Sequence, residues 1–126
     1  MRTKAEKFLI VDDEPDMCWA LEHILEKNGF LTKKALNGSE ALSLIESERF
    51  QLIFLDAKLP DIDGLELAKQ IRKIDPDIRI IIVSGYFYKD DVVIQKALEE
   101  GLIGGFIGKP FFHDEILKAV KTPCSS

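Results

Sequence analysis

The sequence predicts an α/β fold, a single doubly wound five-stranded parallel sheet with helices on both faces. The first observation is that five short apolar runs alternate with amphipathic stretches at a steady spacing along 126 residues. The second is that these runs are apolar throughout, except for the weaker strand at residues 30–35, which contains Thr32, Lys33 and Lys34. Strands buried on both faces are typical of parallel sheets, whose right-handed crossovers place helices on both sides.

The first half of the chain divides into three strands and two helices. The apolar residues of the first helix recur at helical period, with Pro15 in its first turn and Gly29 at its C-terminal end, where these residue types are favoured. Ser39 is a suitable N-cap for the second helix. The expected elements of this half are residues 8–11, 16–28, 30–35, 39–47 and 52–55.

The second half continues the alternation with three helices and two strands. A turn at residues 60–64 precedes the first of these helices. Asp75 before Pro76 ends that helix, because the residue before a proline avoids the helical region. Gly101 ends the next helix. The expected elements are a helix through residues 65–71, a strand at 80–83, a helix at 89–100, a strand at 105–107 and a helix at 113–120.

Composition limits the class of protein and its partners. Residues 1–121 are expected to form one domain, with residues 122–126 a disordered tail or the start of a linker. A formal net charge of -5 argues against binding of nucleic acid, since phosphate backbones require a basic face. Cys18 and Cys124 make no disulfide framework, which favours a cytoplasmic location. The apolar run near the N-terminus is too short for a signal peptide or a membrane span.

Charged and hydroxyl residues stand where four of the predicted strands end. Asp12 and Asp13 follow the first strand, Asp56 the third, Ser84 the fourth and Lys109 the fifth. In doubly wound sheets the carboxyl ends of the strands form the edge at which ligands bind. Three carboxylates brought together at that edge would repel one another, so a site of this kind needs a cation.

Four motifs in this order carry a family resemblance. They are Val11-Asp12-Asp13-Glu14-Pro15, Asp56 with the following Leu59-Pro60-Asp61-Ile62-Asp63-Gly64, Ser84 after a strand, and Lys109-Pro110-Phe111. Together they resemble the receiver domain of two-component response regulators, the CheY-like superfamily, over roughly residues 7–121. The resemblance implies a flavodoxin-like sheet of strand order 2-1-3-4-5 and a signalling function switched by phosphorylation.

The resemblance also implies the chemistry of the site. Asp56 would accept a phosphoryl group from a sensor histidine kinase or a phosphotransfer protein, a known use of aspartate in covalent catalysis. Mg²⁺ would be bound by Asp13, Asp56 and the backbone carbonyl of Lys58, with Asp12 acting mostly through water, a set that suits an octahedral oxygen-seeking ion. The domain would catalyse only its own phosphorylation and dephosphorylation, so it is not expected to be an enzyme in the usual sense.

Three further residues would complete the switch. Lys109 would neutralise one phosphoryl oxygen, and Ser84 would hydrogen-bond to another. Phe106, three residues before the lysine, would swing inward; many family members have tyrosine there, so this chain lacks that hydroxyl. The last two helices and the strand between them would form the readout face for an output domain or an effector protein. The resemblance also allows a phosphorylation-dependent dimer.

Other interpretations of the same residues remain open. Asp12 and Asp13 could simply cap the next helix. The main alternative function is a pseudo-receiver, which acts only as a protein-interaction module. A phosphatase of the haloacid-dehalogenase type would need an aspartate two residues after the nucleophile, where this chain has Lys58. A flavodoxin-like electron carrier would need a phosphate-binding first loop, and an Asp12-Asp13-Glu14 loop would repel phosphate.

Five further residues have more limited expected roles. Lys58 and Tyr86 occupy positions that influence dephosphorylation in the family, and they predict a long-lived phosphorylated state. Asp61 and Asp63 are expected to shape the turn rather than to bind metal. Trp19 is expected to pack at the boundary of the core.

Overall fold

The computed structural model describes residues 6–85 and 91–121. Its elements are β1 (Lys7–Val11), α1 (Pro15–Lys27), β2 (Leu31–Ala35), α2 (Gly38–Ser47), β3 (Leu52–Asp56), α3 (Gly64–Ile74), β4 (Arg79–Ser84), α4 (Val92–Glu99), β5 (Gly105–Gly108) and α5 (His113–Lys121). All neighbouring strands are parallel, in the order β2-β1-β3-β4-β5. The predicted doubly wound α/β fold and its strand order are confirmed. The predictions for Tyr86, Cys124 and residues 122–126 lie outside the described residues.

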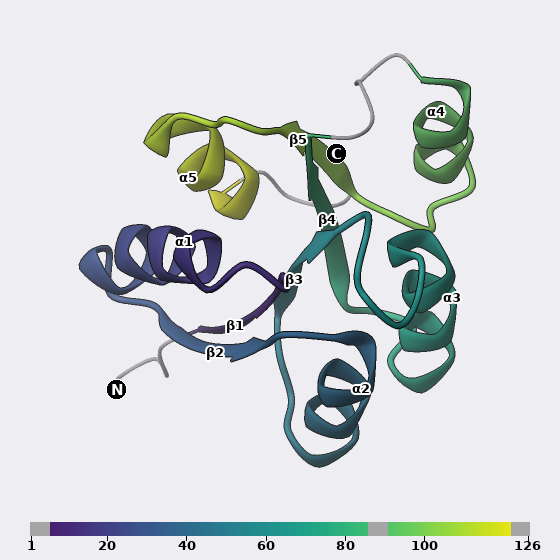
Figure 1. Cartoon of the computed structure of the whole chain (residues 1–126), viewed down its shortest axis with the longest axis horizontal. Coiled ribbons are helices and arrows are strands. Elements are labelled where there is room, and N and C mark those ends of the chain that lie inside the picture. The colour runs from purple at the N-terminus through teal and green to yellow at the C-terminus, as the bar shows by residue number, and fades with distance from the viewer. Residues whose placement is uncertain (1–5, 86–90, 122–126) are drawn as a thin grey trace.

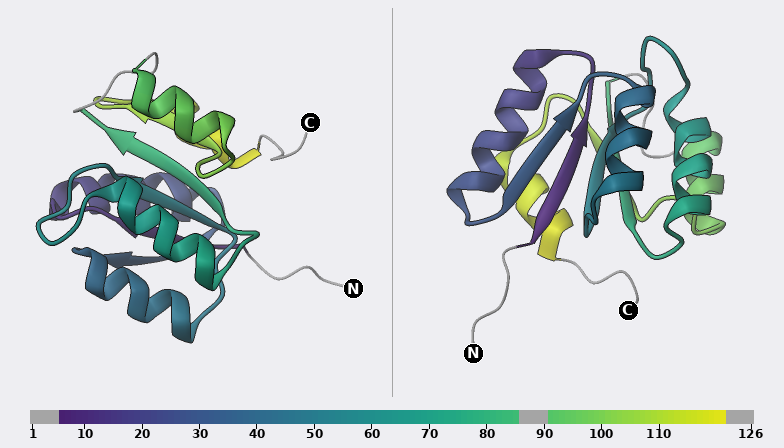
Figure 2. Two further views of the ribbon diagram at one scale, coloured as in Figure 1. Left: turned by 90° about the vertical axis from the view of Figure 1, so that its right-hand side faces the viewer. Right: turned by 90° about the horizontal axis from the view of Figure 1, so that it is seen from below.

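Helices cover both faces of the sheet (Figure 1), and each face has its own hydrophobic core. Alternate residues of each strand point to opposite faces. Leu9, Ile53 and Ile80 pack on one face with apolar residues of α2, α3 and α4. Phe8 and Phe54 pack on the other face with α1 and α5. Figure 2 shows α2, α3 and α4 together in front of the sheet in its left-hand view. Burial on both sides therefore explains the apolar strands β1, β3 and β4, whereas β2 lies at the edge of the sheet and is largely exposed.

Helix ends follow the sequence signals with one exception. Pro15 opens α1, and Gly29 and Gly101 have φ values of +88° and +76°, the left-handed conformation that ends a helix. The prediction of Ser39 as the N-cap of α2 was wrong. Asn37 is the cap, and its side chain accepts a hydrogen bond from Glu40 N at 2.8 Å, because the helix begins earlier than its apolar pattern suggested.

The prediction that Trp19 packs at the boundary of the core was also wrong. Trp19 lies on the outer side of α1 with 62% of its surface exposed, and its ring stacks on that of His23 with centroids 4.8 Å apart. It does not pack at the core boundary, because the α1 side chains that face the sheet include Cys18 and Leu21 instead. Among the described residues, no helix has the length and apolar character needed to cross a membrane.

Candidate functional site

Three carboxylates meet at the carboxyl edge of the sheet. Asp12 and Asp13 lie just after β1, and Asp56 is the last residue of the neighbouring strand β3. One carboxylate oxygen from each lies within 4.8 Å of the other two. The structure thus brings together the acidic residues that the sequence placed at one edge, and their spacing fits a single small cation.

The cluster is buried to different depths. Asp12 and Asp56 are 2% and 8% exposed, whereas Asp13 lies open to solvent. Burial is the largest cause that raises the pKa of Asp56 from 3.8 to about 6, and the negative charge of Asp12 adds to it. The positive charge of Lys109 opposes both effects. The site therefore holds more negative charge than its own residues neutralise.

Lys109 supplies the local counter-charge. Its ammonium Nζ lies 2.9 Å from Asp12 Oδ2 and 3.8 Å from Asp56 Oδ2, and Glu14 Oε1 is 3.6 Å away. Burial lowers the pKa of Lys109, but its hydrogen bond to Asp12 and the surrounding carboxylates outweigh this and raise the pKa above its ordinary value. Lys109 is therefore charged and shared among three acids.

The ends of β4 and β5 set the position of this lysine. Ser84, the last residue of β4, is 1% exposed and pairs in register with Gly108. The backbone N–H of Lys109 donates to the carbonyl of Ser84 at 3.0 Å. Phe106 lies half-buried in β5 beside Ile82 of β4 and packs against the first core. Ser84 and Phe106 therefore flank the lysine from two adjacent strands.

The loop after Asp56 is tightly folded against the strand end. The Lys58 backbone N–H lies 3.4 Å from Asp56 Oδ1, and Lys58 pairs with Asp63 in an antiparallel bridge. Gly64 N donates to Ala57 O at 2.8 Å. A Cβ at Gly64 would meet the carbonyl oxygen of Asp56 and would lie 2.7 Å from Ala57 Cα, so only glycine allows α3 to approach this closely.

Two residues make contacts at the site that were not foreseen from the sequence. Glu14 was noted only as part of a motif, yet its carboxylate reaches Lys109 and its N–H donates to Asp12 Oδ1 at 2.9 Å. Cys18 donates from its Sγ to the carbonyl of Asp12 at 3.3 Å. Burial, followed by the charge of Asp12, raises the pKa of this thiol to about 11, so it stays a neutral donor. None of these contacts has a local sequence signal apart from proximity to Asp12.

Of the two acids expected to shape the turn after Asp56, Asp63 does so, whereas the side chain of Asp61 bonds outside the turn. Asp63 is the N-cap of α3, and its side chain accepts from Glu66 N at 3.3 Å. Asp61 accepts hydrogen bonds from backbone N–H groups at the start of α2.

Comparison with known proteins decides the family. The family model described as "Response regulator receiver domain" matches residues 8–121. The chain belongs to the response regulator receiver family. It is 42% identical over 116 residues to Sporulation initiation phosphotransferase F of Bacillus subtilis (strain 168), covering 92% of this chain and 91% of the relative.

Solved receiver domains have the same fold. A CheY-like response regulator receiver domain protein from Methanospirillum hungatei JF-1 has a TM-score of 0.86 and 30% identity, with 94% of this chain and 92% of that chain covered. The response regulator protein TrrA from Thermotoga maritima, solved in complex with Mg(2+)-BeF, has a TM-score of 0.80 and 34% identity, with 92% and 96% covered. The receiver domain is therefore a signalling module of two-component systems, and its acidic cluster is a group that could bind a metal ion.

Proposed function

We propose that this receiver domain accepts a phosphoryl group on Asp56 from a sensor histidine kinase or a phosphotransfer protein in a Mg²⁺-dependent reaction. The observation that carries the proposal is the juxtaposition of three carboxylates and one ammonium at the edge of the sheet. Asp56 lies in the cluster with an oxygen 3.8 Å from Lys109 Nζ, and Asp12 takes the shorter contact of 2.9 Å.

The residues present fit Mg²⁺. The ion prefers oxygen ligands and is usually bound by one or two carboxylates with several waters. Asp13 and Asp56 would be direct ligands together with the carbonyl of Lys58, and Asp12 would act mostly through water. Burial and the negative charge of Asp12 raise the pKa of Asp56 to about 6. A divalent cation would offset the repulsion between these carboxylates. When bound, the ion would supply positive charge against the oxygens of the incoming phosphoryl group.

The residues of the chain then have defined tasks. Asp56 is largely ionised at neutral pH, because its pKa of about 6 lies below it, and its carboxylate can attack phosphorus. A P–O bond forms to Asp56 while the P–N bond of the donor phosphohistidine breaks, and the released imidazole nitrogen takes a proton from water. Lys109 is already charged and close to Asp56, so it can turn from the carboxylates to a phosphoryl oxygen.

The switch would start at Ser84 and pass to Phe106. Ser84 is buried beside the lysine backbone, where its hydroxyl can bond to a phosphoryl oxygen on Asp56. Phe106 is half-buried on the adjacent strand and can fill space that the serine leaves. A new charge at Asp56 would bias this two-state equilibrium.

The readout face would consist of α4, β5 and α5. Two apolar side chains at the start of α4 are exposed, Val92 at 78% and Val93 at 46%, and Phe112 before α5 is exposed at 77%. These side chains support binding of an output domain, an effector protein or a second receiver on this face.

Intact-mass measurement tests the proposal. The protein is incubated with a small-molecule phosphodonor, with and without Mg²⁺, beside Asp56→Asn. The expected result is one phosphoryl adduct on the wild type with Mg²⁺. No adduct is expected on the wild type without Mg²⁺ or on Asp56→Asn. Failure of the wild type to gain an adduct or to bind Mg²⁺ would favour the alternative, a pseudo-receiver acting only through its surface.

A further inference from the structure

The β3–α3 loop, residues 57–63, connects Asp56 to α3 and contains the Lys58 carbonyl. Its two ends are joined by backbone contacts, the Lys58–Asp63 bridge and the hydrogen bond from Gly64 N to Ala57 O. Within the loop, the Asp61 side chain bonds to a different element. The geometry of the loop is therefore not set by its own backbone alone.

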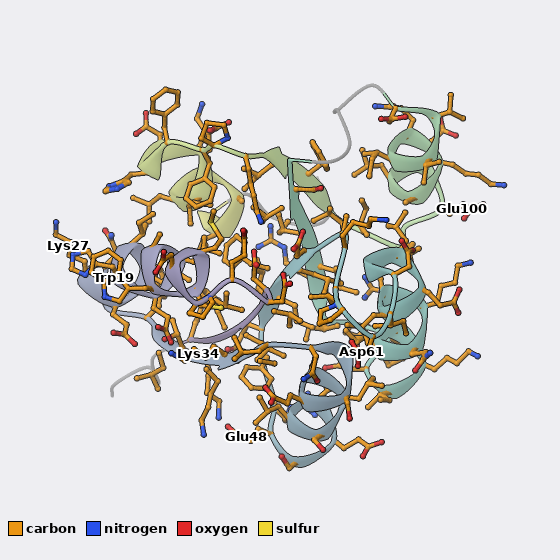
Figure 3. The ribbon with its side chains drawn as sticks, viewed as in Figure 1. Trp19, Lys27, Lys34, Glu48, Asp61 and Glu100 are labelled. Carbon is orange, nitrogen blue, oxygen red and sulfur yellow. The ribbon has the colours of Figure 1, made fainter. Side chains whose placement is uncertain are left out.

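Asp61 joins the loop to the N-terminus of α2. Its Oδ1 accepts from Gly38 N at 2.8 Å and its Oδ2 accepts from Ser39 N at 3.1 Å. The hydrogen bond from Gly38, followed by that from Ser39, lowers the pKa of Asp61, so the carboxylate is ionised at the positive end of the helix. Figure 3 labels Asp61 between α2 and α3. Ile62 continues the contact, since a Cβ on Gly38 would collide with its side chain.

The chain from the end of β2 to the start of α2 also contacts the segment that carries Asp12. The carbonyl of Ala35 accepts from the backbone N–H of Asp12 at 3.1 Å. Residues 35–39 therefore bond to the segment that carries Asp12 and, through Asp61, to the loop that follows Asp56. This connection contributes no side chain to the cluster, yet it links the two segments that form it.

We propose that Asp61 is a positioning residue for the Mg²⁺ site. The inference rests on the proposed function, in which the carbonyl of Lys58, a residue of this loop, is a ligand of Mg²⁺. Asp61 fixes the loop to α2, and α2 packs on the sheet through Ala41 and Ile45. Without the carboxylate, the loop keeps its closed ends but loses its anchor, and the Lys58 carbonyl is held less firmly in place for the ion. Groups that orient ligands in this way typically change metal affinity by about 10- to 100-fold.

The test compares Asp61→Ala with Asn37→Ala by calorimetric titration with Mg²⁺. Each variant removes a side chain that accepts from the first N–H groups of α2, but only Asp61 belongs to the loop. We expect Asp61→Ala to raise the Mg²⁺ dissociation constant about tenfold and Asn37→Ala to leave it within about twofold. Asp61→Asn keeps one acceptor oxygen and should lie between wild type and Asp61→Ala.

A second readout separates positioning from general destabilisation. The rate of phosphoryl adduct formation is measured against Mg²⁺ concentration for the same proteins. Asp61→Ala should need about tenfold more Mg²⁺ for half-maximal rate, with the maximal rate largely kept. Equal Mg²⁺ affinities in Asp61→Ala and wild type, or equal losses in Asp61→Ala and Asn37→Ala, would overturn the inference while leaving the proposed function intact. A wild type that binds no Mg²⁺ would overturn both.

Discussion

At the scale of single residues, the site is a balance between burial and charge. Asp56 is nearly as inaccessible as the apolar residues around it, and Asp12 adds a second buried acid. The ammonium of Lys109 lies within 4 Å of both. The raised pKa of Asp56 shows that this compensation is incomplete. Keeping Asp56 ionised in this buried cluster therefore costs stability.

This cost has a definite pH dependence in the absence of divalent cations. The pKa of Asp56 is about 6 in the folded protein and near 3.8 when unfolded, so the folded state binds the proton more tightly. The free energy of unfolding contributed by Asp56 therefore falls as pH rises from about 4 to about 6, by up to about 3 kcal/mol, and then levels off. Urea denaturation at a series of pH values measures this change.

Asp56→Asn is the matched variant for that measurement, because it cannot titrate. Without metal it should be more stable than wild type near neutral pH, and the difference should shrink toward pH 4. Stability curves that run parallel for the two proteins would contradict the raised pKa.

The residues of the site could be predicted from the sequence where they follow the end of a strand. Asp12, Asp56 and Lys109 could be predicted to meet because each follows an apolar run in a parallel sheet. The contact of Glu14 with Lys109 could not, since it depends on a side-chain direction that spacing does not define. The bonds of Asp61 to Gly38 and Ser39 join residues more than 20 positions apart, so no local pattern announces them.

At the scale of elements, α3 lies very close to the end of β3. Gly64 lies with its Cα against the backbone of Asp56 and Ala57. Gly64→Ala would force α3 away from the strand and should lower the free energy of unfolding by about 1–3 kcal/mol, the usual range for overpacking. Chemical denaturation measures the loss.

Gly104→Ala is the control for this substitution. The nearest atom to a Cβ at Gly104 is Ile80 O at 3.8 Å, an ordinary contact. The control should cost less than about 1 kcal/mol. If both variants lost the same stability, the close packing of α3 on β3 would not be the cause.

Helices and strands could be predicted well because the chain signals them locally. Uniformly apolar runs, Pro15, Gly29 and Gly101 mark where elements start and end. The two errors arose at positions where the pattern of apolar residues gave no signal. The cap at Asn37 depends on a bond made across the first turn, and Trp19 is exposed because no element covers its side of α1 among the described residues. An amphipathic stripe predicts one buried face but not how far coverage extends around the helix.

At the scale of the whole molecule, Mg²⁺ should act as a stabilising ligand. The cluster joins the ends of β1 and β3 and exists only in the folded chain, so binding there favours folding. Saturation to 100 times the dissociation constant should raise the free energy of unfolding by about 2.7 kcal/mol. The gain should weaken as pH falls below about 6, because protons then compete for Asp56. Thermal denaturation with Mg²⁺, against NaCl of equal ionic strength, measures it.

Asp13→Asn provides the comparison, since Asp13 is exposed and its loss leaves no buried charge unpaired. This variant should fold normally and gain much less from Mg²⁺ than wild type does. An unchanged gain would place the ion elsewhere on the molecule.

The whole proposal depends on Asp56 being the acceptor of the phosphoryl group. The most direct measurement is to phosphorylate the protein in Mg²⁺, reduce it with borohydride, and locate the reduced residue by tandem mass spectrometry of its peptides. An acyl phosphate is reduced to an alcohol, whereas a free carboxylate is not, so the reduced residue marks the acceptor. Phosphorylation of Asp56 predicts homoserine at position 56 and nowhere else. Reduction at Asp12 or Asp13, or at no residue in a protein that carries the adduct, would contradict it.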